Sequence, residues 1–226
     1  MKDGVGNPVI FMDGFLSEKD SNEEVWKKEL ADIYPNAPLY RLHWKSKTID
    51  SIFGLSSVFL SRSNLVAAAA SLPVGALYSW REAKKNAEEA GIRLGTYLKD
   101  LKSNRVVLCG HSLGTRVIYH ALMYLYDQWV KSQKDVFNVV EHVHLLGGAV
   151  NIDACWENAQ KIPKQGINNY YSHEDDVLHY LYKTIERQAI GSCEVDGAMV
   201  QNFNVTTQVK GHFEFIKNFS NYACKD

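Results

Sequence analysis

The sequence predicts an α/β fold with a mostly parallel central sheet, and two observations carry this prediction. Short, β-favouring apolar runs alternate along the chain with longer segments of helical periodicity. Most of the short runs are apolar on both faces, which is typical of parallel strands covered by helices on two sides. A length of 226 residues fits one domain, so we expect residues 1–226 to form a single unit.

The first part of the chain predicts two strands and one helix. Residues 8–12 form an apolar run that ends at an Asp-Gly pair, which predicts a buried strand followed by a turn. Ser21 and Glu24 have the spacing of a capping box, which predicts the start of a helix. Two prolines end that helix, and residues 39–44 predict a second strand.

Residues 46–77 form an apolar insert in this pattern. The polar stretch at 61–64 interrupts the insert and Pro73 ends it. A membrane-spanning helix needs about 20 consecutive apolar residues, so we do not expect this segment to cross a membrane. We expect a lid, a core helix or an interfacial segment.

The remaining segments continue the alternation of helices and strands. Residues 81–101 predict an amphipathic helix, and the run at 106–109 predicts a buried strand. The further expected elements are a helix at 115–130, strands at 140–146 and 167–171, a helix at 176–187, a strand at 203–206 and a closing helix at 213–222. We therefore expect a small sheet of five or six strands.

Composition and charge exclude several classes of protein. A net charge of −1 with 23% charged residues argues against a disordered chain and against a nucleic-acid binder that works by bulk charge. The four cysteines are scattered without a C-x-x-C pair, and we expect them to be structural. The N-terminus lacks the apolar region of a signal peptide, so a cytoplasmic location is the default expectation, with export without a cleaved signal as the alternative.

No pattern in the sequence predicts a cofactor or a metal. Neither a G-x-x-x-x-G-K-[ST] loop nor a G-x-G-x-x-G turn after a strand is present. His142 and His144 share one face of an expected strand, but no carboxylate or cysteine clusters with them in the sequence. We expect them to be core or edge histidines.

The chemistry-bearing motif is Gly110-His111-Ser112-Leu113-Gly114, which matches G-x-S-x-G between a buried strand and a long helix. This context is typical of a nucleophile elbow, in which small neighbours let the serine hydroxyl project from a strained turn. The helix that follows presents its positive N-terminal end to developing negative charge.

An acid and a histidine follow the serine in hydrolase order. Asp175 is the first candidate for the acid. It lies on the loop, and the apolar Val177 and Leu178 that follow are expected to be buried in the core. Asp176 and Glu174 remain alternatives, and each acid also fits a solvated loop or a helix N-cap. His212 is the expected general base.

The other histidines are weaker candidates for the base. His173 and His179 flank the acid loop and are rivals to His212, whereas His120 lies within an expected helix. His111 is adjacent to the serine, and we expect it to pack or to form hydrogen bonds locally.

The expected oxyanion hole uses two backbone amides. One is the N–H of Leu113, and the other comes from the loop after the first strand, where Phe15 follows Gly14. An ordinary strand-to-helix turn at Gly14 is the alternative interpretation.

Together Gly110–Gly114, Asp175 and His212 resemble the α/β-hydrolase pattern. A closer resemblance is to the hydrolase-like family whose larger members are called transmembrane and coiled-coil domain proteins. It rests on these residues, in the same order over nearly the whole chain: Gly14-Phe15-Leu16, Trp80, Ala83, Ala87, Glu88, Ala90, Gly91, Ser112-Leu113-Gly114, Arg116-Val117-Ile118, Leu146-Gly147-Gly148, Trp156, Tyr171-Ser172, Asp175 to Leu178 and Gly211-His212.

The resemblance implies a minimal three-layer α/β-hydrolase fold without its first strands, and a triad of Ser112, Asp175 and His212. Two features depart from the family pattern. Membrane-anchored members carry strongly hydrophobic spans around 64–77, where this chain keeps a short alanine-rich stretch, and Asp176 stands where the family tends to have an aromatic residue.

These observations lead to one hypothesis and two alternatives. The hypothesis is a serine hydrolase of carboxylic esters, with a lipid or acyl-chain substrate and peripheral membrane contact through the insert. A thioesterase or amidase would use the same acyl-enzyme chemistry. A non-catalytic interaction or membrane-docking module would have the same fold but would not use the triad for catalysis. The sequence indicates no nucleic-acid partner and no particular oligomeric state.

Overall fold

The computed structural model describes residues 6–14, 21–45, 74–101, 105–132, 139–185 and 188–223. Within these residues six strands form one sheet in the order β2-β1-β3-β4-β5-β6, and every pairing is parallel. The strands are β1 (Val9–Met12), β2 (Leu39–Arg41), β3 (Val106–His111), β4 (Val140–Leu146), β5 (Ile167–Tyr171) and β6 (Val200–Asn204). The predicted α/β class with a parallel sheet is confirmed.

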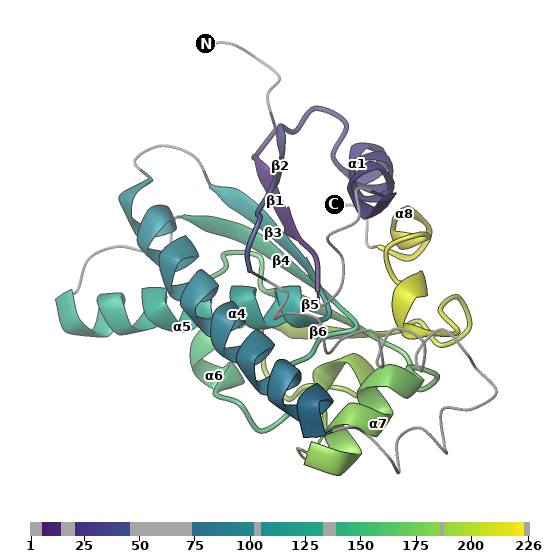
Figure 1. Cartoon of the computed structure of the whole chain (residues 1–226). Coiled ribbons are helices and arrows are strands. Elements are labelled where there is room, and N and C mark those ends of the chain that lie inside the picture. The colour runs from purple at the N-terminus through teal and green to yellow at the C-terminus, as the bar shows by residue number, and fades with distance from the viewer. Residues whose placement is uncertain are drawn as a thin grey trace.

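Helices cover both faces of the sheet (Figure 1). The two long helices α4 and α5 lie on one face, and α1 and α8 lie on the other. The helices are α1 (Ser21–Ile33), α4 (Val74–Asp100), α5 (Leu113–Ser132), α6 (Trp156–Ala159), α7 (Asp176–Ile185) and α8 (Phe219–Tyr222), with the 3-10 turns η1 (Ile190–Ser192) and η2 (His212–Glu214).

The alternation of side chains along β1 shows how the core divides into two parts. Ile10 and Met12 pack with apolar residues of α4 and α5, whereas Val9 and Phe11 pack with apolar residues of α1 and α8. Because successive side chains of a strand point to opposite faces, a strand that helices cover on both sides buries both of its faces. All four residues of β1 are buried accordingly.

Helices α4 and α5 pack closely through two glycines of α4. A Cβ atom at Gly91 would lie 2.6 Å from the carbonyl oxygen of Val117, and one at Gly95 would lie 3.0 Å from that of Ala121. Any larger side chain at these positions would push α5 away. The pair therefore fixes the position of α5, the helix that follows the turn at Ser112.

Two of the expected helices differ from the structure. Helix α4 begins at Val74, so the last four residues of the predicted 46–77 insert belong to this helix, and residues 46–73 lie outside the described residues. The closing helix predicted at 213–222 is wrong, because η2 and α8 are separate and Asn218 between them has a non-helical φ of −128°. Phe215 and Phe219 both pack against the sheet, but the chain changes direction at Asn218 between them, so the predicted segment is not one helix.

None of the helices in the described residues is both long and apolar enough to cross a membrane.

Candidate active site

Ser112 lies at the sharp turn between β3 and α5. Its φ is +56°, and it is the single non-glycine residue with positive φ among the described residues. This left-handed conformation costs a side-chain-bearing residue of order 1–3 kcal/mol, and it persists only where the surroundings impose it.

Three glycines surround the serine because there is no space for a Cβ atom. At Gly114 a Cβ would lie 2.4 Å from the carbonyl oxygen of Met12, and at Gly110 it would lie 2.9 Å from the carbonyl carbon of Gly114. At Gly14, in the loop after β1, it would lie 2.4 Å from the Cβ of Ser112. The β1 loop and the elbow are therefore in direct contact.

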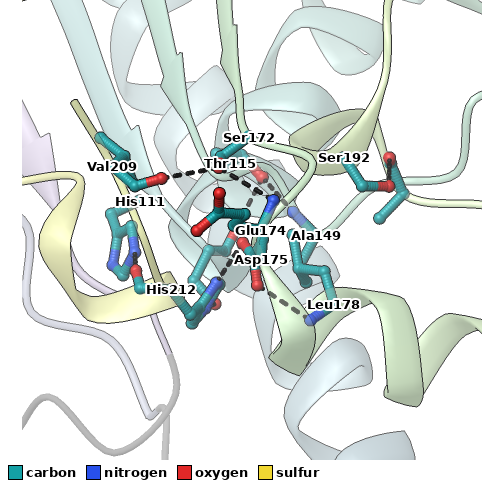
Figure 2. Close-up of polar contacts among 12 residues, drawn as sticks. His111, Thr115, Ala149, Ser172, Glu174, Asp175, Leu178, Ser192, Val209 and His212 are labelled. Carbon is teal, nitrogen blue, oxygen red and sulfur yellow. Dashed lines mark hydrogen bonds and ion pairs between the residues drawn. The ribbon is translucent and has the colours of Figure 1, made fainter. Parts of the chain in front are cut away.

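Hydrogen bonds to the end of β4 hold the serine backbone in this conformation. The Ser112 N–H donates to the Leu146 carbonyl at 3.0 Å. The Ser112 carbonyl accepts from the Thr115 hydroxyl at 2.6 Å and from the Ala149 N–H at 3.1 Å. The Ala149 N–H also donates to the Thr115 hydroxyl at 3.0 Å, and Figure 2 shows these two residues side by side.

The structure brings Ser112, His212 and Asp175 together although they are far apart in the sequence. The Nε2 atom of His212 lies 2.7 Å from the Oγ of Ser112, and its Nδ1 lies 2.7 Å from the Oδ2 of Asp175. A carboxylate only accepts, so Nδ1 carries the proton and Nε2 is free to accept from the serine hydroxyl. All three residues are buried, with Asp175 0% exposed.

Asp175 also holds the start of α7. Its second oxygen, Oδ1, accepts the N–H of Leu178 at 3.0 Å, which is the hydrogen bond of an N-cap residue. Figure 2 shows Asp175 between His212 and Leu178. Asp176 is exposed and begins the helix, while the exposed Glu174 forms an ion pair with Lys210 at 2.9 Å. Neither of these two acids contacts His212.

The rival histidines lie elsewhere. His173 is exposed and contacts the carbonyl of Ser192 at 3.2 Å through Nδ1, and His179 is exposed on α7. His120 lies in α5, as the sequence predicts.

His111 makes a contact that the sequence does not reveal. Its Nε2 lies 2.8 Å from the backbone carbonyl of His212, 101 residues away, so this nitrogen carries the proton and donates. The two rings lie 4.8 Å apart, with Phe215 beside His111. Burial, and next the charge of His212, lower the pKa of His111 to about 3. His111 is therefore a neutral donor that fixes the backbone of His212.

The loops that carry the acid and the histidine are joined by Ser172. Its hydroxyl donates to the carbonyl of Val209 at 2.7 Å and accepts the N–H of Glu174 at 3.1 Å (Figure 2). Ser172 is fully buried. The bond fixes the approach of the chain to His212, and the sequence carries no local signal for it.

The predicted oxyanion hole is only partly described. Leu113 is the first residue of α5, so its N–H lies at the positive end of a 20-residue helix directly after Ser112. Phe15 lies outside the described residues.

A buried polar network anchors the loop before Phe15. The Oδ1 of Asp13 accepts from the Trp26 indole at 2.8 Å, and its Oδ2 pairs with Arg41 at 3.2 Å. The Asp13 carbonyl accepts from the Trp44 indole at 3.0 Å. Burial raises the pKa of Asp13, and the Trp26 hydrogen bond and the Arg41 charge oppose this rise.

The two histidines of β4 and the cysteines are not part of the hydrogen-bonded series Ser112–His212–Asp175. His142 and His144 are buried on β4 with their rings 4.4 Å apart, and His144 contacts the hydroxyls of Tyr34 and Tyr170 at 2.6 and 3.2 Å. The described residues contain no cluster of three potential metal ligands among His, Cys, Asp and Glu. Cys109, Cys155 and Cys193 are free thiols, and Cys224 lies outside the described residues.

The chain is similar to several much longer proteins. It is 33% identical over 142 residues to the rice (Oryza sativa subsp. japonica) transmembrane and coiled-coil domain-containing protein STS1. It is 27% identical over 149 residues to the uncharacterized membrane protein F35D11.3 of Caenorhabditis elegans, and 29% identical over 143 residues to the uncharacterized membrane protein C6F6.13c of Schizosaccharomyces pombe.

These alignments cover 61%, 62% and 60% of this chain, but only 21%, 23% and 18% of the three relatives. The chain thus spans about a fifth of their length. The sequence pattern of a family described as a protein of unknown function, DUF726, matches residues 69–222, which include Ser112, Asp175 and His212. Because this match covers more than half of the chain, the chain belongs to the DUF726 family.

Proposed function

We propose that this protein is a serine hydrolase of the α/β-hydrolase superfamily that cleaves a carboxylic ester, with a lipid or acyl-chain substrate. The observation that carries the proposal is the hydrogen-bonded series Ser112–His212–Asp175, with both contacts at 2.7 Å and the serine at φ +56°. A nucleophile, a base and a residue that orients the base are the minimum for acyl transfer.

The reaction follows from the positions of the protons. His212 Nε2 takes the hydroxyl proton of Ser112 as the Oγ attacks the ester carbonyl. Asp175 keeps Nδ1–H in place and stabilises the imidazolium that forms. His212 then gives the proton to the leaving alcohol, which leaves an acyl group on Ser112. Water, deprotonated by His212, attacks this ester and releases the acid, and the proton returns to Ser112.

The negative charge of the tetrahedral intermediate needs donors that are already oriented. The Leu113 N–H at the start of α5 is one, and we propose the Phe15 N–H as the second. The loop that leads to Phe15 is well suited to this role, because Asp13 is anchored by Trp26, Arg41 and Trp44. One such donor is worth about 10²–10³-fold in kcat.

The preference for an acyl or lipid substrate is supported by apolar packing beside the nucleophile. Leu113 lies in a buried cluster with Trp80 of α4 and with Val177, Leu178 and Tyr182 of α7. This buried cluster gives the serine apolar surroundings, which fit an apolar acyl group better than a charged one. Two of the relatives are named membrane proteins, which fits a substrate found in membranes.

Covalent labelling tests the proposal. A fluorophosphonate probe should label the full chain, and Ser112→Ala should abolish the labelling. Ser132→Ala, at an exposed serine at the end of α5, is the matched control and should label normally. A panel of esters of increasing acyl length then tests the substrate class. Labelling that persists in Ser112→Ala would refute the assignment of the nucleophile, and activity that is independent of acyl length would refute the lipid substrate.

A further inference from the structure

The carbonyl of Ser112 and the N–H of Leu113 belong to one peptide group. A peptide group is planar, and this one is not cis, so its C=O and N–H point in opposite directions and turn together. Whatever holds the Ser112 carbonyl therefore also sets the direction of the Leu113 N–H, the proposed oxyanion donor.

The Ser112 carbonyl is held by Thr115 and Ala149. The Thr115 hydroxyl donates to it at 2.6 Å, and the Thr115 N–H and the Ala149 N–H each donate to it at 3.1 Å. Thr115 lies in the first turn of α5, whereas Ala149 lies in the loop after β4. The carbonyl is thus fixed from its own helix and from the neighbouring strand.

The Thr115 hydroxyl is the centre of this arrangement. An amide N–H only donates, so the 3.0 Å contact from the Ala149 N–H uses an acceptor site of the hydroxyl and leaves its proton for the Ser112 carbonyl. Figure 2 shows Thr115 and Ala149 beside each other. Thr115 is 0% exposed, so bulk water does not take the place of the hydroxyl.

The loop after β4 is shaped to bring Ala149 to this position. Gly147 bends the chain with a φ of +51°, a conformation that favours glycine. The Nε of Arg116, the residue after Thr115, donates to the Ala149 carbonyl at 3.2 Å. Helix α5 therefore holds Ala149 through both its N–H and its carbonyl.

The orientation of the Leu113 N–H needs this support from the carbonyl side. Leu113 is the first residue of α5, and the first N–H groups of a helix have no acceptor within the helix. The preceding residue, Ser112, has a strained φ of +56°, which the surroundings must maintain. Contacts to the Ser112 carbonyl supply that constraint.

We propose that Thr115 is a positioning residue, whose hydroxyl fixes the Ser112–Leu113 peptide group so that the Leu113 N–H points at the oxyanion. This role rests on the proposed hydrolase function and adds a residue to it. When the Ser112 Oγ attacks the ester, the electron pair of the substrate C=O moves to its oxygen. Hydrogen bonds in a series polarise one another, so a donor on the Ser112 carbonyl also strengthens the Leu113 N–H. Thr115 itself does not touch the substrate.

A trifluoromethyl ketone tests this role, because its adduct carries an oxyanion. With octylthio-trifluoroacetone the Ser112 Oγ forms a bond to the ketone carbon, the C=O electron pair moves to the oxygen, and the hydroxyl proton passes to His212 Nε2. The corresponding secondary alcohol has the same skeleton but cannot form an adduct. Inhibition of p-nitrophenyl octanoate hydrolysis by the two compounds separates the oxyanion donors from the rest of the site.

Thr115→Val removes the hydroxyl and keeps the branched shape. Because one oxyanion donor is worth about 10²–10³-fold and here is misaligned rather than lost, ketone inhibition and kcat should both fall by about 10–100-fold, with KM and alcohol inhibition within about twofold. Thr115→Ser restores the hydroxyl and should restore ketone inhibition. Thr96→Val is the matched control, because the exposed Thr96 of α4 also donates to a backbone carbonyl, that of Ile92 at 2.9 Å.

Thr115→Ala loses the same hydroxyl and covers the case in which Thr115→Val does not fold, as thermal unfolding would reveal. Equal ketone inhibition in the folded variants with and without the hydroxyl would overturn the role of Thr115. An equal loss of ketone and alcohol inhibition would also overturn it, because a purely structural role gives that result.

Fluorophosphonate labelling of the parent chain distinguishes these outcomes from a failure of the proposed function. Labelling at Ser112, with ketone inhibition that does not depend on the Thr115 hydroxyl, would refute the role of Thr115 alone. A parent chain that neither the fluorophosphonate nor the ketone modifies would refute the hydrolase and this role together.

Discussion

The contact between Gly14 and Ser112 gives a prediction whose magnitude follows from the structure. In Gly14→Ala the new Cβ would lie 2.4 Å from the Cβ of Ser112 and 2.8 Å from its Oγ, whereas an ordinary contact is 3.4–4 Å. The nucleophile or the loop must therefore move by about 1 Å. A misplacement of that size costs about 10²-fold in rate, which corresponds to about 2.7 kcal/mol of transition-state stabilisation.

The assay is the second-order rate of fluorophosphonate labelling at Ser112, together with kcat/KM for the best ester of the panel. Gly6→Ala is the control, because its Cβ would meet Ala37 at 3.6 Å, an ordinary contact. A thermal unfolding scan establishes that both variants fold, since overpacking alone costs about 1–3 kcal/mol of stability. Labelling of folded Gly14→Ala at the parent rate would show that the loop after β1 does not constrain the nucleophile.

Three further predictions concern the residues around the histidine. Asp175→Asn keeps an acceptor for the α7 cap but loses the charge, so kcat should fall by about 10³–10⁴-fold, whereas the exposed Asp176→Asn should stay within about twofold in the same assay. The depressed pKa of His111, about 3, means that the unfolded chain binds more protons below pH 6.5. The free energy of unfolding should therefore fall as the pH drops from 6.5 towards 4. In urea unfolding, His111→Gln should reduce the slope of this free energy against pH by up to about 1.4 kcal/mol per pH unit. An unchanged slope would contradict this prediction. Ser172→Ala leaves the Glu174 N–H without its acceptor and should lower the free energy of unfolding by about 1–3 kcal/mol. A loss below 0.5 kcal/mol would show that this bond is not structural.

Most of the fold could be predicted from the sequence, because strands and helices leave local patterns of apolar residues in it. Each of the six predicted runs overlaps a strand of the structure. Buried parallel strands are short and largely apolar, and β1 and β3 show this most clearly. The wrong closing helix has the same origin. Phe215, Ile216 and Phe219 recur at helical spacing and all pack on the sheet, but the non-helical backbone at Asn218 divides them. Tertiary contacts decide such a case, and periodicity does not contain them.

Only those parts of the candidate site that belong to a local sequence motif could be predicted from the sequence. The glycines around Ser112 follow from the elbow itself, and the structure places each where a Cβ would collide. The contact of His111 with the His212 carbonyl and the bond of Ser172 to Val209 join segments 101 and 37 residues apart. The anchor of Asp13 on Trp26 and Arg41 likewise spans β1, α1 and β2. No spacing rule within one segment predicts contacts of this range.

Asp175 can cap a helix and contact the histidine at the same time. The sequence left Asp175 open as either a helix cap or a partner of the histidine, but a carboxylate has two oxygens and about four acceptor sites. Oδ1 caps α7 at Leu178, and Oδ2 contacts His212. The cap makes the direction of the carboxylate depend on the position of α7.

The position of α7 depends in turn on Val177, Leu178 and Tyr182, which pack in the cluster that contains Leu113. Leu113 directly follows Ser112, the proposed nucleophile. The serine and the acid therefore share one apolar anchor, and truncating Leu178 should disturb the alignment of the acid with His212 without touching any of the three polar side chains.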